Sequence, residues 1–503
     1  MFYSVGMKRP WYLWLGLFML CGGLSATAQD MRIWTLRDGA TLEGAYGGYE
    51  DGHVILDVAD GRRLGIPIDS FGPQDQPLLC QLTGASASIE DLFADAALWT
   101  TATTEWLSRH AALRLTWVNA DVSARSQHPC LEFNGQRVWE LQASFANDRA
   151  SQVVASLYNR GDAGSLSAEA FKTLLAAAQK ALTGWSGASP SPVREMRGPA
   201  NVRVYAQAWV RAPHQAILQW SLSAGGVPEF IRMRLSPANA AGGAAGGAAA
   251  AAQAMQATAT APRAPLLNSA ALRARVRRDA NGDLLIPDVP MVDQGQKGYC
   301  AAAVTERVLR YYGRDFDQHQ VAQLAGSDAE QGTGGSDLVA AVSRIARGLD
   351  LNFRKCIDMD VERYLKLIDD YNRAARKKNI APFVHEQMID VDLMYRTMDP
   401  ALLREVRIAR AVDMRQFLAT VQENAGAGVP LLWAVQLGLV EETPALPQVA
   451  GGHLRLIVGC NPRTQEILYG DTWGSEHALK RMPLADAWTI TTGLYTMLPR
   501  NVR

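Results

Sequence analysis

The chain has 503 residues, of which 48% are hydrophobic and 20% are charged, a composition typical of globular proteins. At roughly 100 to 200 residues per domain, this length predicts about three domains, each with its own core. Lysine plus arginine and aspartate plus glutamate both number 50, so no net charge favours binding to nucleic acid or to an acidic surface. We therefore expect no nucleic-acid partner.

The N-terminal segment has the pattern of an export signal. The basic pair Lys8-Arg9 precedes an apolar run from Trp11 to Leu20, and small residues then end at Ala28. A membrane anchor is the alternative, but about ten to fourteen apolar residues are fewer than the about twenty that a bilayer of ~30 Å requires. We expect residues 1–28 to be cleaved, which leaves an exported protein, periplasmic or extracellular, without a stable membrane span.

Five cysteines remain after the expected cleavage: Cys80, Cys130, Cys300, Cys356 and Cys460. Because the number is odd and the compartment is oxidising, at least one thiol should stay unpaired, and Cys300 is the candidate. The other four can form two disulfides, Cys80 with Cys130 and Cys356 with Cys460, or can be buried free thiols. The sequence leaves both alternatives open.

Residues 29–80 alternate short strand-like pieces with turns. Three Asp-Gly pairs within about forty residues predict a small meander or barrel. The strand-like pieces are Arg32 to Thr35, His53 to Leu56 and Leu64 to Pro67. The stretch resembles the SLA1 homology domain 1 family through Trp34-Thr35, Glu50 to Val54 and Ile66 to Asp69. The resemblance implies an SH3-like β-barrel with a binding or scaffolding role and a protein ligand.

Residues 85–236 have the pattern of an α+β domain. A helix is expected from Ser167, its cap, to Leu182, with Gly184 as its stop. The expected strands are Leu113 to Trp117, Val202 to Val210, Ile217 to Leu222 and Phe230 to Leu235. No catalytic signature is present here, and the aromatic residues are interpreted as core.

Residues 237–280 form a linker with a basic end. Between 238 and 262 the sequence is almost wholly alanine and glycine, with too little apolar surface to bury a core. Five arginines follow, and they indicate either a solvated tail or a wall-binding or anionic patch. The linker separates two independent halves.

A cysteine lies where a glycine-containing loop meets a helix. The segment from Val289 to Ala303 leads into a helix whose apolar side carries Val304, Val308, Leu309 and Tyr312, so Cys300 would lie at the helix N-terminus. Unsatisfied backbone N–H groups there favour thiolate over thiol. Gln294 lies six residues upstream, where its amide could donate to a developing oxyanion. The alternative is a buried structural cysteine.

A histidine at a strand end can supply the base. His453 follows two glycines and begins a short apolar strand to Val458, and a paired strand from Glu466 to Tyr469 ends just before Asp471. The hairpin would place Asp471 near the imidazole, where it can fix the tautomer and stabilise the imidazolium. Three other histidines are weaker alternatives: His319, expected to be solvated on a helix, His385 and His477.

Together these pieces make residues 281–503 resemble the C39-like branch of the papain-like cysteine peptidases. The matching pieces are Val289 to Ala303, Gly332-Thr333 with the helix from Ser336 to Ala346, Pro430 to Val435, Gly451 to His453 and Tyr469 to Gly474. The resemblance implies a papain-like α+β fold and peptide-bond cleavage through an acyl-enzyme. It further implies Cys300 as nucleophile, His453 as general base and acid, Asp471 as orienter and Gln294 as oxyanion donor.

Two features depart from that family. Its best understood members cut leader peptides while fused to a transporter, and no membrane domain or nucleotide-binding loop is present here, so that substrate cannot be carried over. A charge-rich helical stretch at 357–425 also follows the nucleophile helix, and it is either a lid over the cleft or a structural insert.

The fold class expected for the whole chain is α+β multidomain. Zinc, Walker and serine-hydrolase motifs are absent from the sequence, so no metal or cofactor is expected. The leading hypothesis is a cysteine peptidase acting on a peptide or protein substrate. The rival is a catalytically silent binding protein that uses its SLA1-like and papain-like domains for recognition, through exposed aromatics such as Trp34.

Overall fold

The computed structural model describes residues 31–502 except 37–39, 51, 73, 198–202, 224, 239–266, 296–298, 314–320, 324–337, 350, 386–387, 445, 449 and 501. The expected signal peptide, most of the linker, His319 and Gly332-Thr333 lie outside the described residues. Within the described ranges, no helix has both the length and the apolar character needed to cross a membrane. The chain divides into two compact units, residues 1–83 and 84–503.

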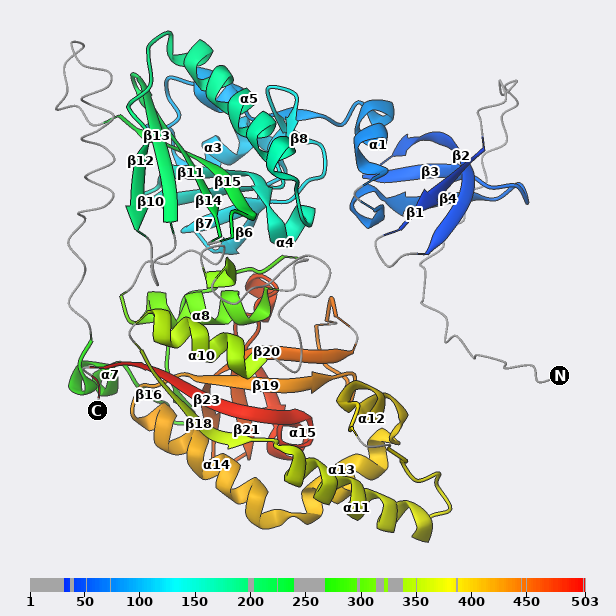
Figure 1. Cartoon of the computed structure of the whole chain (residues 1–503). Helices are drawn as coiled ribbons and strands as arrows, with labels where there is room; N and C mark the ends of the chain where they lie inside the picture. The colour runs from blue at the N-terminus through cyan, green and yellow to red at the C-terminus, as the bar shows by residue number, and fades with distance from the viewer. Residues whose placement is uncertain are drawn as a thin grey trace. The chain divides into compact units, whose positions relative to one another are not determined.

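The first unit is an antiparallel meander in the order β1-β2-β3-β4 (Figure 1). Its elements are β1 (Arg32–Thr35), β2 (Thr41–Glu50), β3 (His53–Asp57), β4 (Arg63–Pro67), η1 (Ile68–Ser70) and α1 (Gln76–Thr83). The expected meander is therefore present, and it includes the strand β2, which the sequence pattern did not reveal. Gly44, Gly47 and Gly48 in β2 interrupt the apolar alternation by which strands are recognised.

Trp34 is a core residue of this meander. The expectation that it is an exposed aromatic is therefore wrong. Its side chain is 2% exposed and meets the Phe71 ring edge-on at a centroid distance of 5.9 Å. Its indole N–H donates to the backbone oxygen of Gly44 at 2.9 Å. Because a buried tryptophan needs a partner for that N–H, the geometry suits a structural residue. Trp34 therefore cannot serve as a surface aromatic for recognition.

The second unit begins with an eight-stranded antiparallel sheet in the order β12-β13-β14-β15-β11-β10-β7-β6. Its strands are β6 (Thr116–Asn119), β7 (Ser123–Ser126), β10 (Glu140–Ala146), β11 (Arg149–Asn159), β12 (Arg194–Arg197), β13 (Arg203–Arg211), β14 (His214–Leu222) and β15 (Pro228–Pro237). A small sheet of β5 (Ala87–Ser88), β8 (Leu131–Phe133) and β9 (Gln136–Arg137), and the helices α2 (Asp91–Ala94), α3 (Thr103–Arg109), α4 (Arg160–Ala163) and α5 (Ala168–Ser186), accompany it.

Local sequence signals predicted the start of the long helix α5 correctly but placed its end too early. Ser167 caps α5, and its side chain accepts a hydrogen bond from the Ala170 N–H, as expected. The helix continues past Gly184 to Gly187, whose φ of 65° ends it in the left-handed conformation. The first strand begins at Thr116, because Arg114 has a φ of 51° after a 3₁₀ turn. The buried Trp106, Trp209 and Trp220 confirm that the aromatic residues form core.

The rest of the second unit contains a sheet whose main path has the order β16-β17-β20-β19-β23-β18, with β21 paired to β20 and β22 paired to β21. The strands are β16 (Arg277–Arg278), β17 (Leu284–Leu285), β18 (Leu351–Asp358), β19 (Leu431–Leu437), β20 (Gly451–Asn461), β21 (Glu466–Gly470), β22 (Lys480–Pro483) and β23 (Thr491–Pro499). The helices are α7 (Ser269–Ala274), α8 (Cys300–Tyr311), α10 (Leu338–Gly348), α11 (Val361–Lys377), α12 (Val391–Thr397), α13 (Pro400–Ala409), α14 (Ala411–Gly426) and α15 (Leu484–Ile490).

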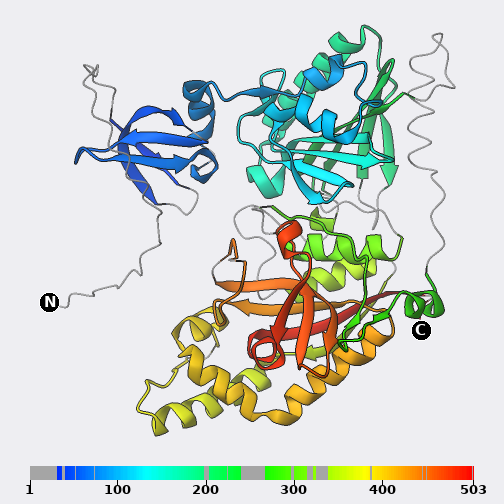
Figure 2. The same cartoon turned by 180° about the vertical axis from the view of Figure 1, so that it is seen from behind.

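Both faces of this sheet are buried. Along β19, Leu432 and Ala434 pack in one cluster with α8 and α10, whereas Leu431, Trp433 and Val435 pack in another with α14 and α15. Successive strand side chains point to opposite faces, so a continuous apolar run serves both clusters. Figures 1 and 2 show α8 and α10 on one side of the sheet and α14 on the other.

The charge-rich stretch is helical, as expected, and forms α11 to α14. Tyr371, Met394 and Leu403 belong to a separate hydrophobic cluster of α11, α12 and α13. Arg407 attaches α13 to the sheet region, because its guanidinium donates to the backbone oxygens of Trp488 at 2.5 Å and Thr491 at 2.7 Å. Figures 1 and 2 show α11 and α13 on the side of the sheet that faces away from α8. The helices α11, α12 and α13 therefore form a small packed subdomain that is attached to the sheet.

The cysteines match neither of the two alternatives in full: Cys80 and Cys130 are disulfide-bonded, whereas Cys300, Cys356 and Cys460 are free thiols. A bridge between Cys356 and Cys460 is excluded because β18 and β20 are separated by β23 and β19 in the sheet. Three steps of about 4.8 Å between neighbouring strands place their backbones well beyond the ~7 Å limit for a disulfide.

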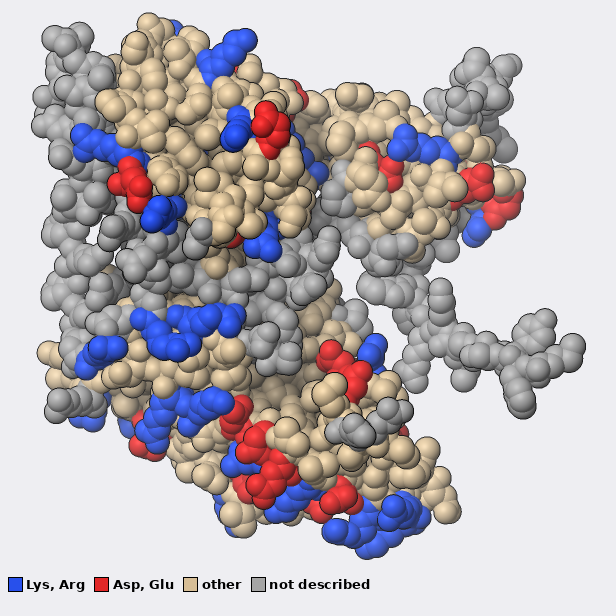
Figure 3. Space-filling model, viewed as in Figure 1, with Lys and Arg blue, Asp and Glu red and all other residues tan. Residues whose placement is uncertain are grey.

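Side chains of both charge signs are present on each unit in the view of Figure 3. This mixture agrees with equal totals of basic and acidic residues in the sequence.

Candidate active site

Cys300 is the first residue of α8, at the helix N-terminus where the sequence placed it. Its side chain is partly exposed, whereas the next three residues, Ala301 to Ala303, are completely buried. Small side chains let the first turn of the helix pack closely on the sheet. The thiol therefore lies at an accessible edge of a firmly packed helix, beside the N–H groups of its first turn.

His453 and Asp471 are brought together by the β20–β21 hairpin. His453 lies on β20 opposite Val435 of β19, and Asp471 follows directly after the last residue of β21. His453 Nε2 is 2.6 Å from Asp471 Oδ1, and both side chains are essentially buried, at 1% and 0% exposure. Because Nε2 is engaged by the carboxylate, Nδ1 is the ring nitrogen that remains for the Cys300 thiol.

The three groups shift one another's pKa values. Burial alone would lower the pKa of His453, but the charge and hydrogen bond of Asp471, together with Cys300, raise the pKa to about 9. Burial alone would raise the pKa of Cys300, but the hydrogen bond and charge of His453 and backbone hydrogen bonds at Leu454 and Ala301 lower it. Both shifts favour a thiolate beside an imidazolium near neutral pH.

Asp471 remains ionised in this buried position. Burial would raise its pKa, but the charges of His453 and Arg455 and the hydrogen bond of His453 hold the pKa well below its usual range. The backbone N–H of Thr472 also donates to Asp471 Oδ1 at 3.0 Å. A carboxylate with these partners can hold the imidazole in one orientation and stabilise its charged form.

Gln294 is held beside these residues by Thr472. The backbone N–H of Gln294 donates to the Thr472 carbonyl at 2.8 Å, and the Thr472 hydroxyl donates to Gln294 Oε1 at 2.5 Å. With Oε1 accepting that hydrogen bond, Nε2 is the end of the amide that can donate to an oxyanion. Gln294 is 4% exposed, so its amide lies within the packed interior of the site.

Trp473 covers the imidazole from one side. Its ring is stacked on His453 with a centroid distance of 4.2 Å and an interplanar angle of 6°. His477 is one of the weaker alternatives for the base. Its ring lies edge-on to the Trp473 ring at a centroid distance of 6.1 Å, and burial lowers the pKa of His477. His385 lies in the helical insert near Phe383. The structure thus pairs His453 with Asp471, and a neutral His477 suits a packing role.

A buried charge network behind Asp471 was not foreseen. Arg455 Nε is 2.8 Å from Asp471 Oδ2, and Arg455 NH2 is 2.9 Å from Glu442 Oε1. Glu442 Oε2 also accepts from the Tyr469 hydroxyl at 2.6 Å and pairs with Lys480 at 3.1 Å. A signal for Arg455 existed in the sequence, since it is a charged residue inside an apolar strand two positions after His453 and therefore on the same face.

Among the described residues, no group of three or more His, Cys, Asp or Glu side chains could hold a metal ion.

Comparison with known proteins identifies the part of the chain that carries these residues. Residues 286–495 match the Peptidase_C39 like family, a range that contains Gln294, Cys300, His453 and Asp471. No curated protein matches the chain. A solved structure found by the comparison is xylellain, a cysteine protease from Xylella fastidiosa, with 11% identity and a TM-score of 0.23 over 47% of this chain and 90% of that chain. The family match supports a C39-like, cysteine peptidase-like C-terminal part.

Proposed function

We propose that the protein is an exported cysteine peptidase that hydrolyses peptide bonds through an acyl-enzyme on Cys300. The observation that supports this best is the buried His453–Asp471 pair, joined at 2.6 Å, next to a thiol at a helix N-terminus. These residues lie in the segment that matches the peptidase family. In this proposal His453 is the general base and acid, Asp471 orients it, and Gln294 donates to the oxyanion.

The reaction follows from the charges of the resting site. The Cys300 thiolate attacks the carbonyl carbon of the scissile bond, and the resulting oxyanion accepts a hydrogen bond from Gln294 Nε2. Imidazolium at His453 gives its proton to the leaving amine as the C–N bond breaks, which leaves a thioester. Neutral His453 then takes a proton from water, the hydroxide attacks the thioester, and the carboxylic acid product leaves with the thiolate restored.

The remaining parts of the proposal concern the N-terminal residues. Export would depend on residues 1–28, and residues 29–80 would be an SLA1 homology domain 1-like module that binds a protein ligand. The meander of β1 to β4 is compatible with such a module. Residues 85–236, the 237–280 linker and the 281–503 peptidase domain complete the proposed domain organisation.

The test is the pH dependence of alkylation at each cysteine. The purified protein is treated with iodoacetamide from pH 4 to 9, and the extent of labelling is read for each thiol by mass spectrometry. Cys356 is an internal control, because it is also partly exposed and free, and burial raises its pKa. We expect Cys300 to react well below the ordinary thiol pKa of ~8.5, and Cys356 to react only at alkaline pH.

A second arm uses two variants. His453→Ala should shift Cys300 labelling toward pH 8.5, and Cys300→Ala should abolish cleavage of a casein substrate without unfolding the protein. If Cys300 and Cys356 follow the same pH profile in the wild type, and His453→Ala changes neither, the peptidase proposal fails. That outcome would favour a catalytically silent binding protein.

A further inference from the structure

Residues 291–295 carry Gln294, and Tyr299 directly precedes Cys300. Residues of the eight-stranded sheet contact these described residues at three places. The first is Asn119 of β6, whose side-chain amide donates to the Met291 carbonyl at 3.1 Å and accepts from the Met291 N–H at 3.2 Å. This two-point contact imitates the pairing of a neighbouring strand, so it fixes both the position and the direction of the backbone.

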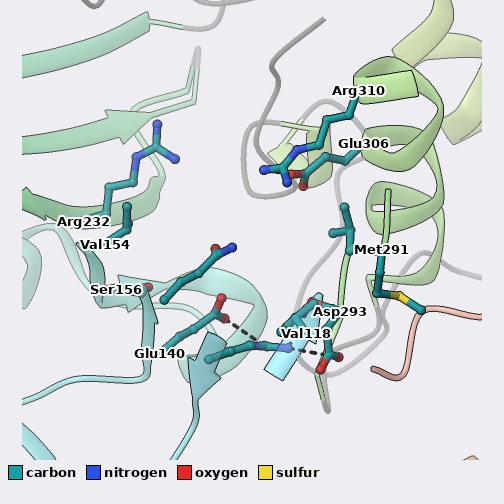
Figure 4. Close-up of a pocket in the computed structure, with 12 residues that line it drawn as sticks. Val118, Glu140, Val154, Ser156, Arg232, Met291, Asp293, Glu306 and Arg310 are labelled. Atoms are coloured by element: carbon teal, nitrogen blue, oxygen red, sulfur yellow. Dashed lines mark hydrogen bonds and ion pairs between the residues drawn. The ribbon is translucent and has the colours of Figure 1, made fainter. Parts of the chain in front are cut away.

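The second contact is made by Arg125 of β7, which is 5% exposed. Its NH1 donates to the Asp293 carbonyl at 3.0 Å and is 3.0 Å from Asp293 Oδ1, while its NH2 is 2.9 Å from Glu140 Oε2. Figure 4 shows Glu140 of β10 and Asp293, joined by dashed lines to the guanidinium between them. Asp293 immediately precedes Gln294, so Arg125 restrains the backbone next to the proposed oxyanion donor.

The third contact is made by Tyr299. The Tyr299 hydroxyl donates to Asn159 Oδ1 at 2.7 Å, and the Gly161 N–H donates to the same oxygen at 3.0 Å. The Tyr299 ring is 2% exposed and lies so close to Gly161 that a Cβ there would overlap it. Tyr299 immediately precedes Cys300, so the residue before the proposed nucleophile is also held by the sheet.

The cavity at this junction is too small for an organic ligand. It has a volume of about 30 Å³ and is lined by Arg125, Glu140, Arg232, Met291, Glu306 and Arg310, among others. That volume is enough for about one or two water molecules. The buried charges are therefore better explained as a structural attachment than as a binding site for a substrate.

We propose that the eight-stranded sheet domain positions the oxyanion donor of the peptidase, with Arg125 as a positioning residue that acts through Gln294. The inference rests on the proposed function of Cys300. Within the peptidase part, Thr472 holds Gln294 from one side. Arg125, Asn119 and Asn159 hold residues that come before and after Gln294 in the sequence, namely Asp293, Met291 and Tyr299. Because a displacement of about 1 Å is enough to impair a catalytic group, this second attachment matters for rate.

The test compares two reactions of the same thiolate. Iodoacetamide is displaced at a saturated carbon, with iodide leaving, so no oxyanion forms. With p-nitrophenyl acetate, the thiolate attacks the carbonyl carbon, an oxyanion forms, p-nitrophenolate leaves, and an acetyl thioester remains on Cys300. The ratio of acylation rate to alkylation rate therefore measures oxyanion stabilisation separately from the reactivity of the thiolate.

Arg125→Gln in the full chain should lower this ratio by about tenfold or more, a part of the ~10²–10³-fold effect of losing an oxyanion donor. Arg232→Gln is the matched control, because Arg232 lines the same cavity but donates to Gln219 of its own sheet at 2.9 Å. It should leave the ratio unchanged. If Arg125→Gln does not fold, Tyr299→Phe removes one hydroxyl and should lower the ratio in the same direction.

A double variant distinguishes an effect on the position of Gln294 from a general loss of structure at the site. In a Gln294→Ala background, Arg125→Gln should have no further effect on the ratio, because its effect passes through Gln294. An unchanged ratio in Arg125→Gln and Tyr299→Phe, or an equal loss in both reactions, would overturn the inference. Slow alkylation of wild-type Cys300 at neutral pH would instead overturn the proposed function, so the two failures are distinguishable.

Discussion

Arg455 Nε lies 2.8 Å from Oδ2 of Asp471, the carboxylate oxygen that His453 does not use. Both side chains have 0% exposure. His453 and Arg455 thus share one carboxylate from the same face of β20. The carboxylate that contacts the imidazole is itself paired with a second, fully buried side chain, the guanidinium of Arg455.

We expect Arg455→Met to destabilise the protein by about 3–5 kcal/mol, because it leaves Asp471 and Glu442 buried without their shared partner. The control is Arg373→Gln, which removes an exposed pair with Asp370 at 3.2 Å and should cost about 0–1 kcal/mol. Urea unfolding followed by tryptophan fluorescence gives both values. Equal unfolding midpoints for the two variants would show that the buried network adds no stability.

Asp471→Asn should narrow the pH range in which thiolate and imidazolium coexist. Losing the carboxylate charge removes the chief cause that raises the pKa of His453 to about 9, so that pKa should fall toward or below ~6.5. Imidazolium is then lost at lower pH, and the pKa of Cys300 should rise because His453 no longer favours its thiolate.

Two measurements check this change. Iodoacetamide labelling of Cys300 should shift toward alkaline pH, and NMR titration of the His453 ring should shift toward acid pH. His477→Gln is the control, since His477 lies beyond Trp473 and should leave both curves in place. Identical curves for Asp471→Asn and wild type would contradict the assignment of Asp471 as orienter.

Trp473→Ala should expose the His453–Asp471 pair to water. The stacked ring at 4.2 Å covers one face of the imidazole, and water would screen the attraction that raises the pKa of His453. We expect a lower His453 pKa by NMR titration and slower neutral-pH labelling of Cys300. Trp473→Phe keeps a stacked ring and should retain most of the wild-type behaviour; equal effects of both substitutions would argue against shielding.

Gly161→Ala should slow acylation of Cys300 although it lies outside the peptidase family match. A Cβ at Gly161 would overlap the Tyr299 ring and displace the residue before Cys300. Gly184→Ala is the matched control, because a Cβ there meets nothing within 4 Å and replaces a helical glycine, a change worth about 1 kcal/mol of stability. Wild-type acylation by p-nitrophenyl acetate in Gly161→Ala would show that the Tyr299 contact is dispensable.

Several features could be predicted from the sequence because they depend on neighbouring residues. The helix beginning at Cys300 and the cap at Ser167 follow from local patterns of apolar and capping residues. The approach of His453 to Asp471 follows from one short hairpin, β20 and β21, whose antiparallel register needs no distant contact.

Other expectations were wrong where packing outweighed local signals. Trp34 is a core residue, because the meander folds its ring onto Phe71. Helix α5 passes through Gly184, since a single glycine costs a helix only about 1 kcal/mol and packing supplies more than that. Cys356 and Cys460 stay apart because the strand order of the sheet separates them, and no spacing in the sequence encodes that order.

The sequence by itself determined the peptidase-like segment, its candidate nucleophile and the hairpin with the candidate base, since local periodicity and short turns encode them. The tertiary structure alone decided that Arg455 shares Asp471 with His453 and that Arg125 holds Asp293, 168 residues further along the chain. Such contacts arise only when whole sheets pack and exclude water. The sequence places Arg455 on the same strand face as His453, but only this packing decides which buried charges become partners.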